Sequence, residues 1–306
     1  MTFDEFIKRF LTEEQCEAYL YEMRWGDGFV CPKCGNDTHW KTKRLLYTCT
    51  KCQHQASVTA GTIFQDTRKP LRNWFTAIWW VTTQKYGASA EGLQQVLGLK
   101  SYETAWAWLH KIRKAMVVPN RSMLSGTVEI DECYIGGKAE GGKPGRGSEN
   151  KTLVAVAVEL DGKKLGRIRL NTIKDASFES LSPFIMENIS KGSKLVTDDW
   201  SGLSGIESKG YERVVYKQST ATCEEEMLPH VHLVISLLKR WLLGTHQGAV
   251  DSKYLQSYLD EYVFRFNRRK SAKRGLLFYR LLENAMVVEP STLSDIMVGR
   301  VLESSR

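Results

Sequence analysis

Four cysteines near the start of the chain have the spacing of a metal site. They form two C-x-x-C pairs separated by fourteen residues, at Cys31, Cys34, Cys49 and Cys52. Four thiolates that converge in this way suit a tetrahedral zinc ion, and a closed four-cysteine site leaves no open coordination position. We therefore predict a structural zinc ion. A redox pair or a chance spacing is the alternative interpretation.

A carboxylate within an apolar run is a second chemical signal. Residues 127–137 read TVEIDECYIGG, a β-branched and aromatic segment that ends in a glycine pair, as a strand before a turn does. Asp131 stands in its middle. A buried charge is costly without a counter-charge, and a cation is the natural ligand of a carboxylate. Alternatively, Asp131 points to solvent from an edge strand.

The elements that would hold Asp131 follow the order of an RNase H-like fold. Three strands, a helix, two strands and a helix are predicted at residues 127–136, 152–160, 165–170, 177–189, 194–197, 211–216 and 229–243. This order puts Asp131 on the central strand and Asp198 at the end of its neighbour, so that both carboxylates can face one metal site. Asp198 or Asp199 capping the following helix is the alternative.

Two facing carboxylates suit phosphoryl transfer assisted by two metal ions. One ion activates the attacking hydroxyl and the other stabilises the leaving oxygen, with the ions about 4 Å apart. Hard oxygen ligands favour Mg²⁺ or Mn²⁺. We therefore predict that Asp131 and Asp198 bind magnesium or manganese.

Between the cysteines and this domain, three helices are predicted, at residues 71–86, 89–97 and 102–116, with a turn around Gly98 before the third. This is the outline of a helix-turn-helix, in which the third helix would enter the DNA major groove with Lys100 and Tyr102 near its leading end. A three-helix packing unit without DNA contacts is the alternative.

Basic clusters favour a polyanionic partner. The net charge is +8; residues 33–72 hold eight Lys or Arg against two acids, and residues 265–274 hold six against none. Such clusters are typical of nucleic-acid binding, although charge alone also fits a solvated surface. Arg268 and Arg269 of the second cluster are predicted to contact double-stranded DNA. No apolar run approaches the ~18 residues of a membrane span, and the start of the chain has no signal-peptide pattern. We therefore expect no membrane partner. The expected location is the cytoplasm, in the bacterial cytosol or nucleoid.

Several motifs resemble one family in the order in which they occur. They are V-E-x-D-E-x-x-x-G-G at 128–137, V-T-D at 196–198, S-L-L-K-R at 236–240 and Y-L-D-E-x-x-F-R-x-N-R at 258–268. With the zinc ribbon, they resemble the zinc-ribbon DDE-type transposases of the 1595 group of insertion sequences. The resemblance implies a Mg²⁺-dependent DNA strand-transfer enzyme that recognises the inverted repeats of its own element. It implies that Asp131 is the first catalytic carboxylate and Asp198 the second, with Asp199 as the alternative for the second.

The third catalytic position departs from the pattern of that family. The family has an acid or Asn seven residues before a lysine, whereas here His232 precedes Lys239. Seven residues make two helical turns, so both side chains share one face, where Lys239 would contact a phosphate. We predict His232 as the third member, with a weaker second metal or a preference for Mn²⁺ as the consequence. His230, Glu224–Glu226 and Glu261 remain alternatives.

The sequence thus predicts a multidomain α+β protein. It comprises an N-terminal helical segment (1–26), a zinc ribbon (27–60), a helix-turn-helix (61–118), and an α/β RNase H-like catalytic domain with a C-terminal helical extension (124–306). A transposase that acts as a homo-oligomer on element ends and target DNA is the leading hypothesis. The alternatives are a DNA-binding regulator with an inactive nuclease fold, or a structure-specific nuclease.

Overall fold

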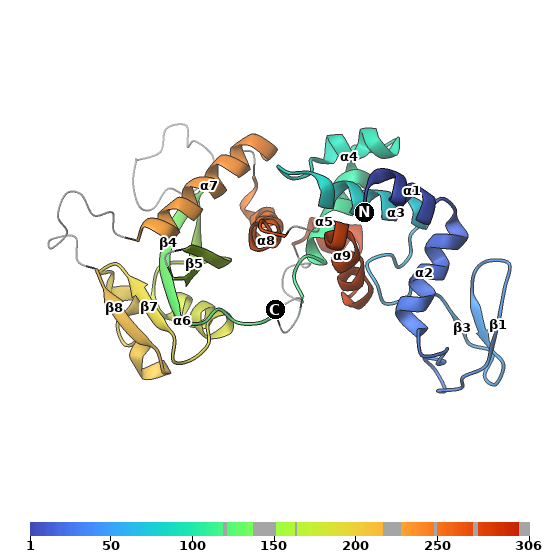
Figure 1. Cartoon of the computed structure of the whole chain (residues 1–306), viewed down its shortest axis with the longest axis horizontal. Helices are drawn as coiled ribbons and strands as arrows, with labels where there is room; N and C mark the ends of the chain where they lie inside the picture. The colour runs from blue at the N-terminus through green and yellow to red at the C-terminus, as the bar shows by residue number, and fades with distance from the viewer. Residues whose placement is uncertain are drawn as a thin grey trace. The chain divides into compact units, whose positions relative to one another are not determined.

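The computed structural model of the chain describes residues 1–118, 121–136, 151–162, 164–216, 228–247, 250–271 and 275–299. The chain forms two compact units, and most of their elements are labelled in Figure 1: unit 1 is Met1–Pro119 with Ser271–Arg306, and unit 2 is Asn120–Lys270. Among the described residues, no helix is long and apolar enough to cross a membrane.

Unit 1 combines helices with a small three-stranded sheet. Thr2 and Thr12 each begin a helix with a complete capping box, which satisfies first-turn N–H groups. The helices of the unit are α1 (Phe3–Arg9), α2 (Glu13–Trp25), α3 (Leu71–Thr83), α4 (Ala90–Leu97), α5 (Tyr102–Lys114), α9 (Gly275–Val287) and α10 (Leu293–Met297). The strands are β1 (His39–Lys41), β2 (Tyr47–Cys49) and β3 (Gln55–Ala56), paired antiparallel in the order β1-β2-β3.

Helix α2 is tied to the small sheet by one buried acid. Glu17 is 1% exposed, and it accepts a hydrogen bond of 2.6 Å from Nζ of Lys41 and another from the hydroxyl of Tyr47. A buried carboxylate needs such donors in place of water. Helix α2 and the small sheet are therefore joined by polar contacts as well as by packing.

Helix α9 packs within unit 1, although the sequence predicts it as part of the catalytic domain. The ring of Phe278 lies 5.5 Å from Phe6, 5.5 Å from Phe10 and 6.0 Å from Phe75 of α3. The structure therefore differs from the predicted 124–306 domain after residue 270. Periodicity predicts that such a segment is an amphipathic helix, but it does not say which apolar surface the helix covers.

The sheet of unit 2 has five strands in the order β6-β5-β4-β7-β8. They are β4 (Thr127–Ile135), β5 (Thr152–Asp161), β6 (Lys164–Ile173), β7 (Lys194–Thr197) and β8 (Glu212–Val215). The β4–β5 and β5–β6 pairs are antiparallel, and the β4–β7 and β7–β8 pairs are parallel. The predicted order and the central position of the strand with Asp131 are confirmed, which makes this the RNase H-like arrangement.

Helices cover both faces of this sheet. On one face, Val128 and Ile130 of β4 share a core with α6 (Phe178–Asn188). On the other, Cys133 and Ile135 share a core with α7 (Pro229–His246) and α8 (Ser252–Asn267), and α7 can be followed across β4 in Figure 1. Because side chains alternate along a strand, Glu129 and Asp131 belong to the face that α7 covers.

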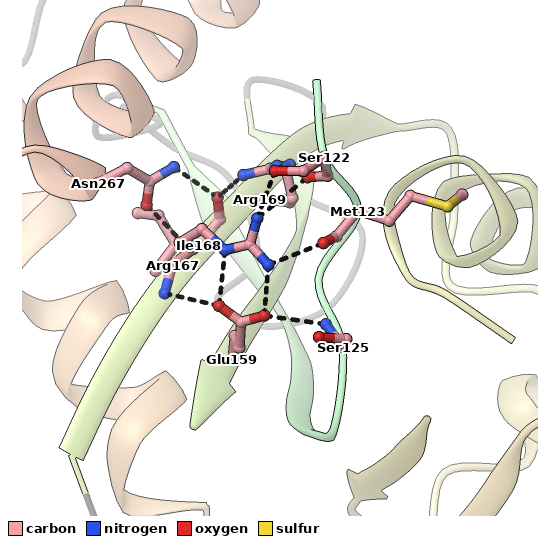
Figure 2. A network of polar contacts seen from close by, with 8 residues as sticks. All are labelled: Ser122, Met123, Ser125, Glu159, Arg167, Ile168, Arg169 and Asn267. Atoms are coloured by element: carbon pink, nitrogen blue, oxygen red, sulfur yellow. Dashed lines mark hydrogen bonds and ion pairs between the residues drawn. The ribbon is translucent and has the colours of Figure 1, made fainter. Parts of the chain in front are cut away.

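The segment that leads into β4 is clamped to the sheet (Figure 2). Arg167 of β6 donates two bonds to Glu159 of β5, at 2.7 and 2.6 Å, and others to Oγ of Ser122 (2.7 Å) and the carbonyl of Met123 (2.8 Å). Glu159 in turn accepts from the N–H of Ser125 at 2.9 Å. This bidentate pair fixes where the chain enters the central strand.

Candidate metal and catalytic sites

The four cysteines converge as their spacing predicts. Their sulfur atoms all lie within 4.8 Å of one another, with Cys31 to Cys52 and Cys34 to Cys49 both at 3.6 Å. A tetrahedral ion with bonds of about 2.3 Å to sulfur requires sulfur separations of about 3.8 Å, so the cluster fits zinc. No fifth group among the described residues joins the cluster.

Backbone donors prepare one of these thiols for an ion. Burial raises the pKa of Cys49, but the N–H groups of Cys52 and Lys51 oppose this effect and the net result is a pKa lowered to about 6. A thiol with such a pKa is largely thiolate at neutral pH, which is the form that binds metal. The backbone therefore favours the charged form of Cys49, whereas at Cys34 the Asn36 N–H is outweighed by the neighbouring thiols, which raise the pKa of Cys34 to about 12.

Strands β4 and β7 bring two carboxylates to one edge of the sheet. They run parallel, with Glu129 opposite Val196. Asp131 and Asp198 each come two residues later, and so they follow this pair on the same face, at the carboxyl ends of the paired segments. Asp199 is exposed and alternates to the other side. In open α/β sheets the carboxyl ends of parallel strands are where ligands bind.

The carboxylate of Asp131 is largely buried and lies beside an imidazole. Its Oδ1 atom accepts a 2.8 Å bond from the N–H of Glu132, and its Oδ2 atom is 3.3 Å from Nε2 of His232. Burial raises the pKa of Asp131; the Glu132 N–H and the charge of His232 oppose the rise, and the negative charge of Asp198 adds to it. The structure thus brings the first predicted catalytic residue together with the second and the third.

Asp198 is held by its own loop and by an arginine. Its Oδ1 atom accepts from the N–H of Trp200 at 3.0 Å. Arg213 of β8 donates to Oγ1 of Thr197 (3.0 Å) and to the carbonyls of Asp198 (3.2 Å) and Trp200 (2.9 Å). This arginine therefore fixes the backbone from which Asp198 projects.

Helix α7 carries His232 and Lys239 on its exposed side. His232 has a side chain that is 43% exposed, against 19% for Asp131, so a substrate can reach it. Burial raises the pKa of the Cys133 thiol of β4 to about 12. Lys239 lies close enough to this thiol for its positive charge to oppose the rise. Both predicted residues thus lie along the strand that carries Asp131.

The alternatives for the third position are engaged elsewhere or lie outside the described residues. His230 places its Nδ1 atom 2.7 Å from Glu129. Glu261 is 1% exposed and pairs with Arg265 of the same helix at 2.7 Å. The run at 224–226 lies in a part of the chain that the structure does not describe.

The predicted DNA contacts lie in both units. In unit 1, Lys100 and Tyr102 are exposed where α5 begins, with Tyr102 at 55% exposure. In unit 2, Arg268 and Arg269 lie over the rings of Phe264 and Phe266, at 4.1 and 4.0 Å from the ring centres.

Arg269 also has a structural task. It donates to the carbonyls of Leu165 (2.6 Å) and Gly166 (3.1 Å), and so it fastens the end of α8 to β6. Its role in DNA contact stays a prediction.

Two residues that shape the site were not predicted from the sequence: Glu129, which is the partner of His230, and Arg213. Glu129 had a signal, since it stands two residues before Asp131 and therefore on the same face of the strand. Arg213 had none, because its target is a backbone loop that only the fold brings near.

Comparisons with known proteins agree with this architecture. Residues 123–267 match the ISXO2-like transposase domain, and residues 11–55 match the transposase zinc-ribbon domain. A curated relative is the "Uncharacterized protein in transposable element ISH50" of Halobacterium salinarum, 30% identical over 133 residues. That match covers 42% of this chain and spans 44% of the relative's length.

Solved structures give weaker similarities. The catalytic core of BIV integrase is 14% identical, with a TM-score of 0.31, over 48% of this chain and 85% of that one. A chain of the pre-cleavage Mos1 transpososome is 12% identical, with a TM-score of 0.29, over 72% and 82%. Scores this low carry no structural argument.

The two domain matches decide the class. The predicted resemblance to the zinc-ribbon DDE-type transposases of the 1595 group of insertion sequences is confirmed.

Proposed function

We propose that this protein is an active transposase that binds the terminal inverted repeats of its insertion sequence and catalyses metal-dependent DNA cleavage and strand transfer. One observation carries the proposal: Asp131 of β4 lies 3.3 Å from His232 of α7, and the negative charge of Asp198, which follows β7, acts on the same carboxylate. The matches of the chain to a transposase domain and to a transposase zinc ribbon support the same function.

The two carboxylates would hold Mg²⁺ or Mn²⁺, for which their oxygen atoms are suited. When bound, the ions would activate the attacking hydroxyl and stabilise the leaving oxygen. His232 would supply the third ligand or orient a water, and Lys239 would hold a phosphate near the cleavage point. The nucleophile would be water or a 3′-hydroxyl, with no covalent bond to the protein.

DNA recognition would use unit 1. We infer that α3, α4 and α5 act as a helix-turn-helix whose leading residues, Lys100 and Tyr102, contact bases or phosphates. Gly98 ends α4 in the left-handed conformation (φ 60°) and thereby makes the tight turn before α5. The zinc ribbon at 27–60, with its basic residues, would add phosphate contacts. Arg268 and Arg269 would contribute from unit 2.

Transposition requires two element ends to be held together, so a homo-oligomer is part of the proposal, as is action on cytosolic DNA. The competing function is a DNA-binding regulator with an inactive nuclease fold. The histidine at position 232 favours it, because imidazole is a poorer ligand than a carboxylate for Mg²⁺.

The test is a cleavage assay on DNA that contains one element end, with Mg²⁺ or Mn²⁺ added. The parent protein should cut at the end, and Asp131→Asn should lose at least 10³-fold of the rate, since its carboxylate is a direct metal ligand. Asp199→Asn is the matched control: this exposed neighbour should keep the parent rate. A parent that binds the end DNA and never cuts would identify the regulator, and cutting by DNA shape rather than at the end sequence would identify a structure-specific nuclease.

A further inference from the structure

Glu129 holds the first turn of helix α7. Its Oε2 atom accepts hydrogen bonds from the backbone N–H groups of His230 (3.0 Å) and Val231 (2.8 Å), and its Oε1 atom lies 2.7 Å from Nδ1 of His230. The Glu129 side chain is 5% exposed. A carboxylate buried to this degree needs several donors in place of water, and α7 supplies three.

Helix α7 has no side-chain cap from the residue that precedes it. Leu228, at the N-cap, is left-handed (φ 56°) and makes no capping hydrogen bond, and Pro229 follows at the first helical position. The N–H groups of a first turn have no acceptor within the helix, and the positive end of the helix dipole favours a negative charge. Glu129 supplies that cap from strand β4.

The same strand and the same helix meet again at the catalytic residues. Asp131 follows Glu129 by two positions on one face of β4, and His232 follows His230 by two positions on α7. His232 lies 3.3 Å from Asp131, and His230 lies 2.7 Å from Glu129. A shift of α7 along or about its axis would therefore disturb both contacts at once.

We propose that Glu129 is a positioning residue of the site, which fixes the N-terminus of α7 against β4 so that His232 lies beside Asp131. The catalytic consequence rests on the proposed function, whereas the capping itself does not. Glu129 acts here through its hydrogen bonds and not as a metal ligand, and this distinguishes it from Asp131.

Two substitutions separate these roles. Glu129→Gln keeps an oxygen for both N–H groups and an amide toward His230, so the end-cleavage rate should stay within about threefold of the parent. Glu129→Leu removes the acceptors at similar size, and kcat should fall about 10²-fold with KM for DNA little changed, because a misplacement of about 1 Å can cost that much. The proposal is overturned if Glu129→Gln loses as much activity as Asp131→Asn, which would mark a metal ligand, or if Glu129→Leu loses none.

Amide hydrogen exchange tests the cap without any activity. In the parent, the N–H groups of His230 and Val231 should be protected, although first-turn amides normally exchange freely. Protection should persist in Glu129→Gln and fall at least tenfold in Glu129→Leu, relative to amides in the middle of α7. Glu187→Leu, which removes an exposed carboxylate from α6 on the other face of the sheet, is the control and should leave both amides protected.

A second variant covers the case in which Glu129→Leu does not fold. His230→Ala removes the ring contact with Glu129 and keeps both backbone N–H groups, so Val231 should remain protected and activity should fall less than tenfold. Unprotected amides in the parent would refute the cap outright. If the parent protein fails to cut end DNA while both amides are protected, the proposed function fails and the cap stands.

Discussion

The two sites of this protein are built in opposite ways. The cysteine cluster draws all four ligands from residues 31–52, and its sulfurs lie within 4.8 Å of one another. The carboxylate site draws Asp131 from β4, Asp198 from the end of β7 and His232 from α7, and among the described residues only the cysteines form so compact a group. A closed site stabilises a fold, whereas an open one leaves coordination positions for a substrate.

This comparison predicts that the closed site matters most for folding. Cys49→Ala should abolish zinc binding and unfold the ribbon, because the apparent binding free energy of such an ion, about 10–16 kcal/mol, is folding free energy. Binding to end DNA should fall by more than 10²-fold while the melting of unit 2 is unchanged. Zinc content, calorimetry and a binding titration measure this. Cys16→Ala, at a buried cysteine outside the cluster, should keep its zinc; retained zinc in Cys49→Ala would break the comparison.

The open site should respond to the chemistry of its third ligand. His232→Ala should lower the rate of end cleavage about 10²-fold, and His232→Glu should raise the ratio of the Mg²⁺ to the Mn²⁺ rate above that of the parent, because carboxylate oxygen suits Mg²⁺ better than imidazole does. Cleavage rates in each metal provide the ratio. Leu233→Ala, at the exposed neighbour, should change neither rate. An unchanged metal ratio in His232→Glu would remove His232 from the site.

The open site should also depend on groups that never touch the metal. Arg213→Met should leave Asp198 on a looser loop, because three hydrogen bonds to the backbone and to Thr197 are lost. We expect about a tenfold rise in the Mn²⁺ concentration needed for half-maximal cleavage. Lys209→Met, at an exposed lysine of the preceding turn, serves as the control. Equal metal dependence in Arg213→Met and the parent would show that the loop holds its shape alone.

The smallest effect concerns stability. Burial and Asp198 raise the pKa of Asp131, so the folded state holds this proton more tightly than the unfolded chain and loses stability as pH rises through the interval between the two pKa values. Without added Mg²⁺ or Mn²⁺, Asp131→Asn should therefore melt at a higher temperature than the parent. The gain should be full above the folded pKa and absent below the ordinary aspartate value of about 3.9.

Thermal melts of unit 2 at several pH values measure this gain, with about 2–4 °C expected for each ~1 kcal/mol in a domain of this size. Asp199→Asn, at an exposed carboxylate, should show no gain. A lower melting temperature for Asp131→Asn at neutral pH would mean that the pair with His232 outweighs the cost of burial.

Much of this architecture could be predicted from the sequence, because its signals are local. Two C-x-x-C pairs need only a tight turn to converge, and the alternation of apolar residues around Asp131 marks a strand whose face is set by period two. The order of strands and helices then restricted the sheet to few topologies, so that Asp131 and Asp198 were expected to be neighbours. The first two of these conclusions rest on residues that are close in the chain, and the third rests on the order of the elements.

The tertiary structure decided what depends on packing between distant segments. It placed α9 against the aromatic rings of Phe6, Phe10 and Phe75, since an amphipathic helix fits any apolar surface of the right shape. In the structure, His230 contacts Glu129 and His232 lies beside Asp131, although the sequence places both imidazoles on the same helical turn. The sequence determined which groups could do chemistry; the burial of Glu129 beneath the start of α7 decided which of them meet.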